Sequence, residues 1–374
     1  MSDSPLKYKI AFASIRGMGV ELAQTLLDVI PNEEYFFNAS QQELSTKLQT
    51  KNKIIESNYR QKLLHAAEDE VKFVLDHGIS ISYFTDSNFP VRLLNAPDAP
   101  ILLYTKGSCD LNHKKIISIV GTRNASSYGT QFCETLVNDM ANLLNDVVII
   151  SGLAYGIDIA AHRAALANNI PTVAVLAHGL NTIYPAVHRG SAIEILKHGG
   201  MLVTDYSSQD VICRANFLAR NRIVAGLSDC TIVVESAEKG GAMTTANIAA
   251  SYNRDVFAVP GRINDQLSTG CNKLIKNNIA SLITCLDDLV KAMGWECRAE
   301  SPKQKELFPE LSEDESRIYN FIKEKNEIHI NLIYAALKIP MPQLLSFLVD
   351  LEFKGVITSH PGNKYSITFK NCDL

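Results

Sequence analysis

Short apolar runs alternate with longer helical patterns between about residues 114 and 295. The apolar runs are rich in β-branched residues and lack polar alternation, which is typical of strands buried on both faces of a parallel sheet. Six strands are predicted on this basis, at 116–120, 147–150, 172–177, 201–205, 231–235 and 255–259. Because helical patterns separate successive strands, the sequence predicts an α/β fold with a doubly wound, Rossmann-like parallel sheet.

The rest of the chain divides into shorter parts with other patterns. A length of 374 residues favours two or three domains. The predicted parts are a helical N-terminal domain (1–77), a Rossmann-like core domain (78–295), a charged linker that contains prolines (296–311) and a C-terminal domain (312–374). The core domain is expected to begin with short strands and turns, because three prolines lie between residues 78 and 110.

Two glycines mark a turn inside the helical N-terminal domain. Gly17 and Gly19 lie between two helical patterns, within the segment 15–20. Such a turn is found in SAM-like and helix–hairpin–helix-like domains, where backbone N–H groups hold a DNA phosphate. A tight turn between helices, without any ligand, fits the same residues, so both interpretations stay open.

The C-terminal domain is predicted to be winged-helix-like. Ser312 and Glu315 form a capping box that opens a helix. The segments 355–358 and 365–367 are separated by a turn and predict a two-stranded wing.

The charge of the next predicted helix argues against a role in reading DNA. The helix at 342–354 carries Asp350 and Glu352 against a single cation, Lys354. A helix that faces phosphates is normally basic. We therefore expect this helix to pack internally or to bind a partner.

The residues that follow the predicted strands are candidates for a binding site, because ligands of open α/β sheets bind beyond the carboxyl ends of the strands. After the strand at 147–150, the chain passes Gly152 and Gly156 and enters an Ala-rich helix, with Asp158 as the predicted N-cap. The glycines allow close approach of backbone or ligand, and the helix start presents unpaired N–H groups. This arrangement predicts an anion site that suits a phosphate.

A second phosphate-binding turn is predicted later in the core domain. Gly240 and Gly241 open a helix there, and the hydroxyl group of Thr244 can donate beside them. Arg123 and Arg262 follow the first and last predicted strands, which places both guanidinium groups on the same edge of the sheet. Bidentate hydrogen bonds from guanidinium to phosphate are strong and geometrically specific.

The most basic stretch of the core domain is the predicted helix at 214–226. Arg220, Asn221 and Arg222 are consecutive, so they spread over an arc wider than one helix face, and only some can meet one ligand. A solvated helix face is the alternative interpretation. Residues 111–295 contain 15 basic and 14 acidic residues, so cations are concentrated at loop ends within a nearly neutral domain.

Several enzyme classes fit the sequence poorly. Ser151, Asp158 and His162 suggest a catalytic triad, but the last two lie one helical turn apart and no G-x-S-x-G motif is present. We expect Asp158 to cap its helix and His162 to be buried. Glu235 is a possible general base without a second carboxylate at a suitable spacing. The sequence also lacks the P-loop and the dinucleotide-binding motif.

Composition narrows the function further. The net charge of −4 excludes a chain-wide polyanion-binding surface, so any nucleic-acid site must be local. The eight cysteines include no C-x-x-C motif and no spacing that favours a metal. The sequence has no apolar run of membrane-spanning length and no signal peptide. We expect a cytoplasmic protein with reduced thiols, no metal, no cofactor and no membrane association.

Several blocks of the core domain, taken in order, resemble the DNA-processing protein A family (DprA, also called Smf). The matching blocks are 119–123, 151–163, 173–180 with Tyr184-Pro185, Asn216-Phe217, 220–228, 241–246 and 256–261, with Gly270, Asn272 and Leu274-Ile275 beyond them. They run across residues 80–290. The sequence departs from the family pattern at Leu218, where the family usually has proline, and at His188 before Arg189, where the family favours asparagine.

The resemblance implies a protein that binds single-stranded DNA and is not an enzyme. Members of the family protect incoming single strands during natural transformation, load the RecA recombinase onto them and act as dimers. Carried over to this sequence, the resemblance implies the following DNA-binding residues: Gly121, Thr122, Arg123, Ser151, Gly152, Gly156, Arg189, Arg220, Asn221, Arg222, Gly240, Gly241 and Thr244.

Two other functions remain open for this fold. One is a phosphoribohydrolase-like enzyme that cleaves the base from a nucleoside monophosphate. Its loop has the form Pro-Gly-Gly-x-Gly-Thr followed by Glu, whereas residues 239–244 lack both the proline and that carboxylate. The other is an assembly platform for a recombinase, to which DNA would contribute little.

Overall fold

The computed structural model describes residues 5–50, 52–298, 311–325 and 327–367. The chain forms two compact units, Met1–Arg298 and Ala299–Leu374, and each is described by itself. Most of the predicted linker, residues 299–310, lies outside the described residues.

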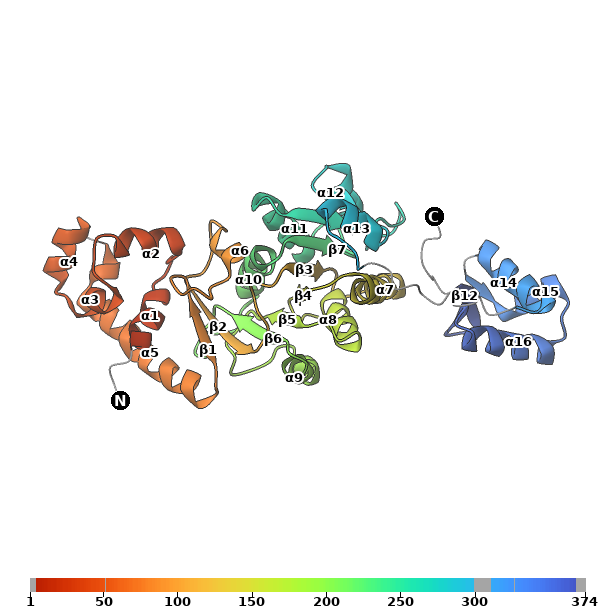
Figure 1. Ribbon diagram of the computed structural model, residues 1–374, viewed down its shortest axis with the longest axis horizontal. Coiled ribbons are helices and arrows are strands. Elements are labelled where there is room, and N and C mark those ends of the chain that lie inside the picture. The colour runs from red at the N-terminus through yellow and green to blue at the C-terminus, as the bar shows by residue number, and fades with distance from the viewer. Residues whose placement is uncertain (1–4, 51, 299–310, 326, 368–374) are drawn as a thin grey trace. The chain divides into compact units, whose positions relative to one another are not determined.

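A nine-stranded sheet forms the centre of the first unit (Figure 1). Its strands are β1 (Ser80–Tyr83), β2 (Leu102–Gly107), β3 (Lys115–Val120), β4 (Val147–Ser151), β5 (Thr172–Val175), β6 (Met201–Thr204), β7 (Cys230–Val233), β8 (Asp255–Ala258) and β9 (Ser281–Leu282). The order across the sheet is β1-β2-β6-β5-β4-β3-β7-β8-β9. Strands β3 to β9 all run parallel to one another. Strands β1 and β2 add an antiparallel edge, in which β2 pairs with β6.

The predicted α/β fold is confirmed, since all six predicted strands are present with ends shifted by at most two residues. The chain runs from β3 to β6 in one direction and then returns to place β7 on the other side of β3. Ligands of doubly wound sheets bind at such a reversal of strand order, outside the carboxyl ends of the strands. The fold therefore directs attention to the loops that follow β3, β4 and β7.

Helices cover both faces of the sheet. They are α7 (Ser127–Leu143), α8 (Ile157–Ala167), α9 (Arg189–Lys197), α10 (Arg214–Leu227), α11 (Gly241–Ser251), α12 (Thr269–Lys276) and α13 (Leu286–Met293). Successive strand residues point to opposite faces, so Ile116 packs in the core beneath α10 and α11 while Ile117 packs in the core beneath α7 and α13. The strands read as continuous apolar runs because both faces are buried.

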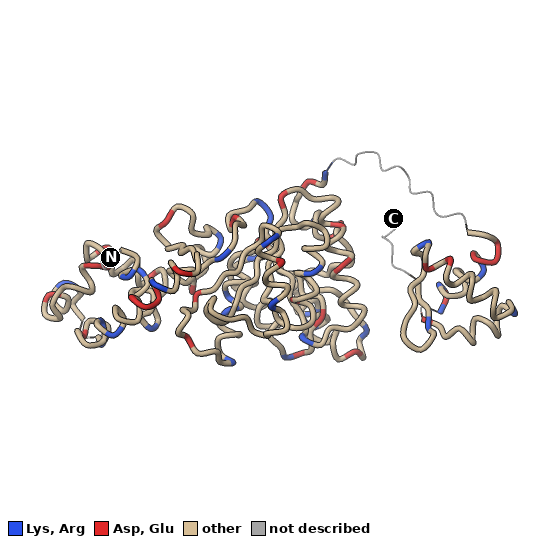
Figure 2. The backbone as a smooth tube through the Cα atoms, turned by 90° about the horizontal axis from the view of Figure 1, so that it is seen from below, with Lys and Arg blue, Asp and Glu red and all other residues tan. Residues whose placement is uncertain are grey.

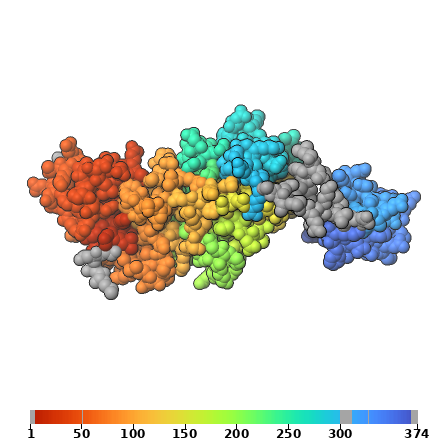
Figure 3. Space-filling model, in the orientation of Figure 1, coloured from red at the N-terminus to blue at the C-terminus, as the bar shows by residue number. Residues whose placement is uncertain are grey.

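The N-terminal part of the first unit is helical, as its pattern predicts. It contains α1 (Pro5–Ala13), α2 (Val20–Leu27), α3 (Glu33–Asn38), α4 (Gln41–Leu48), the 3₁₀ turn η1 (Lys53–Ile55) and α5 (Ser57–Asp76). Phe12 and Phe36 meet edge-to-face in its core, with ring centroids 5.4 Å apart. That core is continuous with the apolar residues of β1, β2 and α10, and the helices lie directly against the segment that follows them (Figure 3).

The turn predicted at residues 15–20 joins α1 to α2. Gly17 has a φ of +81°, a left-handed conformation that favours glycine. The amide of Met18 donates to the carbonyl oxygen of Ile15 at 3.0 Å. This geometry is common to both interpretations of the turn, so phosphate binding there stays a prediction.

A carboxylate of α5 ties the helical part to a loop of the sheet. Glu70 is only 2% exposed and accepts hydrogen bonds from the backbone N–H and the hydroxyl group of Ser208. Ser208 lies in the loop between β6 and α10. This loop is therefore held by a helix that precedes the sheet in sequence.

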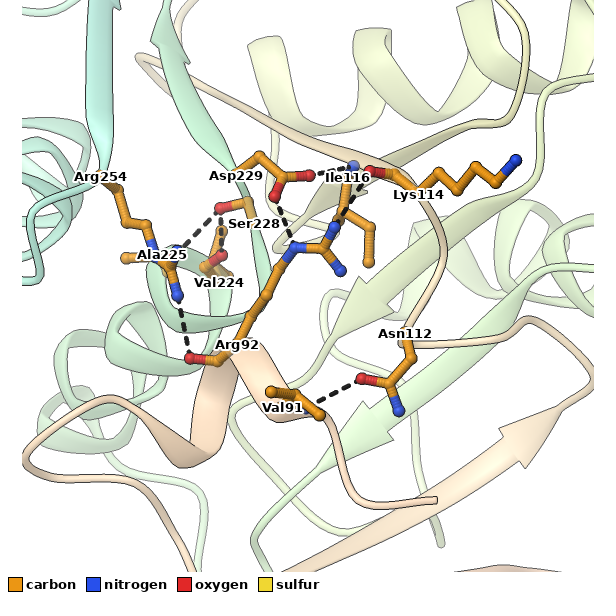
Figure 4. Close-up of polar contacts among 10 residues, drawn as sticks. All are labelled: Val91, Arg92, Asn112, Lys114, Ile116, Val224, Ala225, Ser228, Asp229 and Arg254. Atoms are coloured by element: carbon orange, nitrogen blue, oxygen red, sulfur yellow. Dashed lines mark hydrogen bonds and ion pairs between the residues drawn. The ribbon is translucent and has the colours of Figure 1, made fainter. Parts of the chain in front are cut away.

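A second polar cluster fastens the short helix α6 (Val91–Leu94) to the amino ends of two strands (Figure 4). Asp229, directly before β7, accepts from Nε of Arg92 at 2.6 Å and from the backbone N–H of Ile116 at 2.8 Å. Arg92 also donates to the carbonyl oxygen of Lys114, and Arg254 donates to that of Arg92. These contacts lie at the opposite edge of the sheet from the loops that follow β3, β4 and β7.

The second unit is a small winged-helix fold. Its elements are α14 (Glu313–Lys325), β10 (Glu327–His329), α15 (Ile330–Leu337), α16 (Met341–Phe353), β11 (Ile357–His360) and β12 (Lys364–Ile367), and the strand order is β10-β12-β11. The predicted capping box is present, because Ser312 and Glu315 exchange backbone-to-side-chain hydrogen bonds of 2.7 and 3.3 Å. The predicted wing corresponds to β11 and β12, and β10 adds a third strand that the sequence pattern did not predict.

No single helix of the described residues is long and apolar enough to cross a membrane, although α15 and α16, bent by 118° at their junction, meet the criterion together by length and composition alone.

Candidate functional site

The loops after β3, β4 and β7 are in direct contact. The backbone N–H of Ile157 donates to the carbonyl oxygen of Thr122 at 3.2 Å, and that of Thr122 donates to Glu235 at 2.7 Å. Gly156 has a φ of +75°, and a Cβ atom there would overlap the Thr122 oxygen. Gly121 is equally restricted, because its Cβ would overlap the side chain of Ile157. These glycines therefore allow the two loops to touch.

Arg220 from α10 is buried beneath these loops. Its side chain is 5% exposed, and Nη1 donates to the carbonyl oxygens of Gly152, at 2.7 Å, and of Val175. The guanidinium group occupies the space that a Cβ on Gly152 would need. Burial lowers the pKa of Arg220, and the charge of Asp158 opposes this shift. Arg220 thus joins the carboxyl ends of β4 and β5 from below.

Asp158 has a different role from the predicted one. The N-cap of α8 is Gly156, and Asp158 lies in the first turn, where its carboxylate accepts from the backbone N–H of Gly152 at 3.2 Å. The prediction of Asp158 as N-cap is wrong because the left-handed Gly156 already starts the helix. Burial raises the pKa of Asp158, while the neighbouring Arg220 lowers it.

His162 is buried, as the sequence analysis expected. Its Nδ1 lies 2.7 Å from Oγ1 of Thr172, and Thr172 itself donates to the carbonyl oxygen of Ile149. Because the threonine proton is used in that second bond, Nδ1 of His162 must donate, and Nε2 carries the lone pair. Burial lowers the pKa of His162 to about 3, and the charge of Arg220 adds to the effect. The imidazole is therefore neutral.

Arg222, two residues after Arg220 on the same helix, also has partners within the chain. Nη2 forms an ion pair of 2.5 Å with Asp205, and Nη1 donates to the carbonyl oxygen of Asp98 at 2.7 Å. Burial raises the pKa of Asp205, and Arg222 lowers it. Asn221 is also buried and donates to the carbonyl oxygen of Gly241 at 3.3 Å. The three consecutive residues of α10 thus bind the loops of this edge to one another.

Two other arginines that were predicted to bind DNA have exposed side chains, in contrast to Arg220 and Arg222. Arg123 and Arg189 are both exposed at this edge, and Arg123 has no ion pair among the described residues. The guanidinium carbon of Arg123 lies 5.7 Å from the centre of the Phe217 ring. An arginine on an aromatic face is oriented without losing its hydrogen-bond donors. Arg123 is thus presented to solvent above the glycine loops.

The second glycine turn also lies at this edge. Helix α11 begins at Gly241 with Gly240 as its N-cap, and no side chain caps it. Its first N–H groups point outward, and Thr244 donates from Oγ1 to the Gly240 carbonyl oxygen at 3.4 Å. Lys239, directly before this turn, is exposed.

Ser151 and Glu235, which were considered for catalysis and found unsuited to it, make structural contacts. Ser151 is buried, and its hydroxyl donates to the carbonyl oxygen of Ile119 at 2.6 Å. Glu235 is 1% exposed and accepts from the backbone N–H of Ser126 at 2.9 Å and from its hydroxyl. A Cβ on Gly129 would collide with the same carboxylate. Glu235 therefore holds the start of α7.

The aromatic residues at this edge were not among the predicted DNA-binding residues. Tyr155 precedes Gly156, and its ring meets that of His188 edge-to-face at 5.0 Å. Tyr184 packs against Phe217 at 5.6 Å. Their position beside strand-end glycines and arginines is a signal that could have identified them.

These features define a Rossmann-like protein with a glycine-rich, partly cationic edge and a separate winged-helix unit. The sequence model of the DNA recombination-mediator protein A family matches residues 80–294, and that of the DprA winged helix domain matches residues 302–363. The chain therefore belongs to the DNA recombination-mediator protein A family, which confirms the resemblance to DprA and Smf.

Individual relatives agree with this assignment. Protein Smf of Escherichia coli (strain K12) is 37% identical over 294 residues, which covers 74% of this chain and 75% of the relative. The X-ray structure of DNA processing protein A from Streptococcus pneumoniae is similar with a TM-score of 0.61 at 30% identity, over 78% of this chain and 98% of that one. A structure of the protein from Helicobacter pylori, described as giving insights into its unique single-stranded DNA binding mode, has a TM-score of 0.51 at 30% identity, over 57% and 95% of the two chains.

Proposed function

We propose that this protein binds single-stranded DNA without sequence preference at the carboxyl edge of its sheet. The observation that carries the proposal is the exposed guanidinium group of Arg123 above the glycine loops of Gly121, Gly152 and Gly156. An exposed guanidinium group that has no ion pair among the described residues suits a phosphate diester. The described binding of single-stranded DNA by the Helicobacter pylori relative supports the same ligand.

The other predicted residues contribute in different ways. Arg189, Gly240, Gly241 and Thr244 are accessible and are proposed to contact the DNA backbone. Arg220, Asn221 and Arg222 already have partners in the chain, so we propose that they hold the loops in place. Ser151 can contribute through its backbone only, because its hydroxyl group is bonded within the sheet. Thr122 keeps a hydroxyl proton to donate, since its Oγ1 accepts from the backbone N–H of Asn124.

Arg123→Ala tests this site. The substitution should weaken binding to all single-stranded sequences alike, because a phosphate contact carries no base information. The slope of log affinity against log salt concentration should become shallower by about 0.7 for each phosphate that the protein no longer neutralises. Fluorescence anisotropy with a labelled oligonucleotide at several salt concentrations measures both quantities.

Lys114→Ala is the matched control. It removes the same charge from the opposite edge of the sheet, where Lys114 is paired with Asp146 at 3.6 Å. Its affinity should stay at the wild-type value. Unchanged affinity and an unchanged salt slope in Arg123→Ala would show that the DNA lies elsewhere.

We further propose that the bound strand is protected and passed to the RecA recombinase, and that the protein acts as a cytoplasmic dimer. Family membership supports this sequence of events. RecA filaments should form sooner on single-stranded DNA in the presence of the protein, and sedimentation should give the mass of a dimer. A RecA complex that forms equally well without DNA would favour the assembly platform instead.

We propose that the site carries out no catalytic step. The carboxylate of Glu235, the candidate general base, is occupied by Ser126. The rival phosphoribohydrolase activity predicts free base when nucleoside monophosphates are incubated with the protein. Release of base that is abolished in Glu235→Gln would favour the enzyme.

A further inference from the structure

Three aromatic side chains lie near the exposed Arg123: Phe217 contacts it, Tyr184 packs on Phe217, and Tyr155 belongs to the loop that touches the Arg123 backbone. We call them the aromatic rim. Tyr155 and Tyr184 are 49% and 51% exposed, so a large part of each side chain is open to a ligand. Phe217 is half-buried and lies between Arg123 and Tyr184. The rim is therefore directly connected to the proposed phosphate site.

Each tyrosine is held in place on one side and open on the other. The ring of Tyr155 meets the His188 ring at 64°, and Nδ1 of the buried His188 lies 2.8 Å from the carbonyl oxygen of Leu153. The backbone N–H of Tyr184 donates to Nε2 of His178 at 3.1 Å, and its ring meets Phe217 at 60°. Edge-to-face contacts of this kind fix the orientation of a ring and leave a face exposed.

Tyr155 is adjacent to the phosphate site through the backbone. It directly precedes Gly156, whose missing Cβ would lie 2.7 Å from the carbonyl carbon of Arg123. Exposed aliphatic side chains extend the apolar surface along the neighbouring loops, with Val187 68% and Leu218 48% exposed. A ligand bound here meets a cation and open aromatic faces side by side.

We propose that Tyr155 and Tyr184 stack on unpaired bases of the DNA strand whose phosphates are held by Arg123 and the glycine loops. This inference rests on the proposed function and adds to it the reason for preferring single strands. In a duplex, both faces of each base are covered by neighbouring pairs, so only unpaired bases can stack on protein rings. The charge of Arg123 complements the phosphates, and the rim complements the bases.

The test compares two oligonucleotides of equal length and charge, one of thymidines and one of abasic sites. Tyr155→Ala and Tyr184→Ala should each weaken binding to oligothymidine by about fivefold or more, the value expected when one base no longer stacks on an aromatic ring. Both variants should bind the abasic strand as wild type does. Tyr155→Phe and Tyr184→Phe keep the ring and should restore binding to oligothymidine.

Tyr334→Ala is the matched control, because Tyr334 of α15 is 46% exposed and lies in the winged-helix unit. It should have wild-type affinity for both strands. Equally weakened binding to the thymidine and abasic strands would overturn the proposal, since the rings would then only position the loops. Unchanged affinity of both Ala variants for oligothymidine would also overturn it. A wild-type protein that binds neither strand would instead refute the proposed function itself.

Discussion

Arg123 and Arg220 lie on the same edge of the sheet, yet their guanidinium groups have opposite surroundings. Arg220 is bonded to two carbonyl oxygens beneath the loops, whereas Arg123 is exposed on the face of Phe217. The sequence places Arg123 after a predicted strand and Arg220 within a predicted helix, but it does not show which guanidinium group faces solvent. That difference depends on the glycine at position 152, whose missing side chain leaves room for Arg220. The sequence therefore predicted that arginines lie at this site, but it could not predict which guanidinium group is exposed.

His162 predicts a measurable dependence of stability on pH. Its folded pKa is about 3, whereas the unfolded chain takes up the proton near pH 6.5. The unfolded state therefore binds one more proton between these values, and the folded state loses stability as pH falls through this window. The slope for one proton is about 1.4 kcal/mol per pH unit.

His162→Asn should remove that part of the pH dependence. The asparagine amide can donate to Thr172 as Nδ1 of the imidazole does, and it does not titrate. Urea unfolding of both proteins between pH 4 and pH 7 measures the difference in slope. Parallel curves for the two proteins would contradict the assignment of His162 as a buried neutral imidazole.

At the scale of the elements, the sheet was predictable and its antiparallel edge was not. The six parallel strands consist of apolar runs that are buried on both faces, and this pattern is strong. The sequence predicted no pairing partner for β1 and β2. Strand β2 pairs with β6, about 100 residues further along the chain. The helix α6 between them is only four residues long and is positioned by the charged cluster around Asp229 (Figure 4). Pairing between strands so far apart in the sequence produces no local periodic pattern from which it could be predicted.

Asp229→Ala should therefore lower the stability of the first unit. The substitution removes the ion pair with Arg92 and leaves the Ile116 N–H without its acceptor, which should lower the free energy of unfolding by about 2 kcal/mol. Chemical denaturation followed by circular dichroism measures the change. Asp287→Ala is the comparison, because Asp287 is paired with Lys291 on an exposed face and should cost less than about 0.5 kcal/mol. Similar effects in the two variants would show that the Asp229 cluster has no special role.

At the scale of the whole molecule, acidic and basic positions are interspersed. Lys and Arg positions lie among Asp and Glu positions along the backbone of the described residues (Figure 2), and the net charge of the chain is −4. The winged-helix unit follows this pattern: Lys354 is paired with Glu315 at 2.6 Å, and the first turn of α14 is acidic. The sequence analysis expected this unit to have a role other than reading DNA, and its charges remain compatible with that prediction.

A fragment that ends at Arg298 should keep the affinity of the full chain for single-stranded DNA within about twofold, or ~0.4 kcal/mol. All the proposed DNA-binding residues lie in the first unit. The salt dependence should also be unchanged, because every neutralised phosphate keeps its partner. Anisotropy titrations of the two proteins give both values. A steep fall in affinity in the fragment would assign DNA binding to the winged-helix unit as well.

The hydrogen bonds between Glu70 and Ser208 determine how short a functional fragment of this protein can be. The family sequence model begins at residue 80, which suggests that the sheet alone is the functional module. Yet the loop after β6, which contains the exposed Val211 and leads into the helix of Arg220, is anchored by a carboxylate ten residues upstream of that limit. The family sequence model gives the part of the chain that relatives share. The contact between Glu70 and Ser208 shows that α5 must be expressed together with the sheet if this loop is to keep its anchor. Domain dissection of this protein should therefore begin no later than Ser57, the first residue of α5.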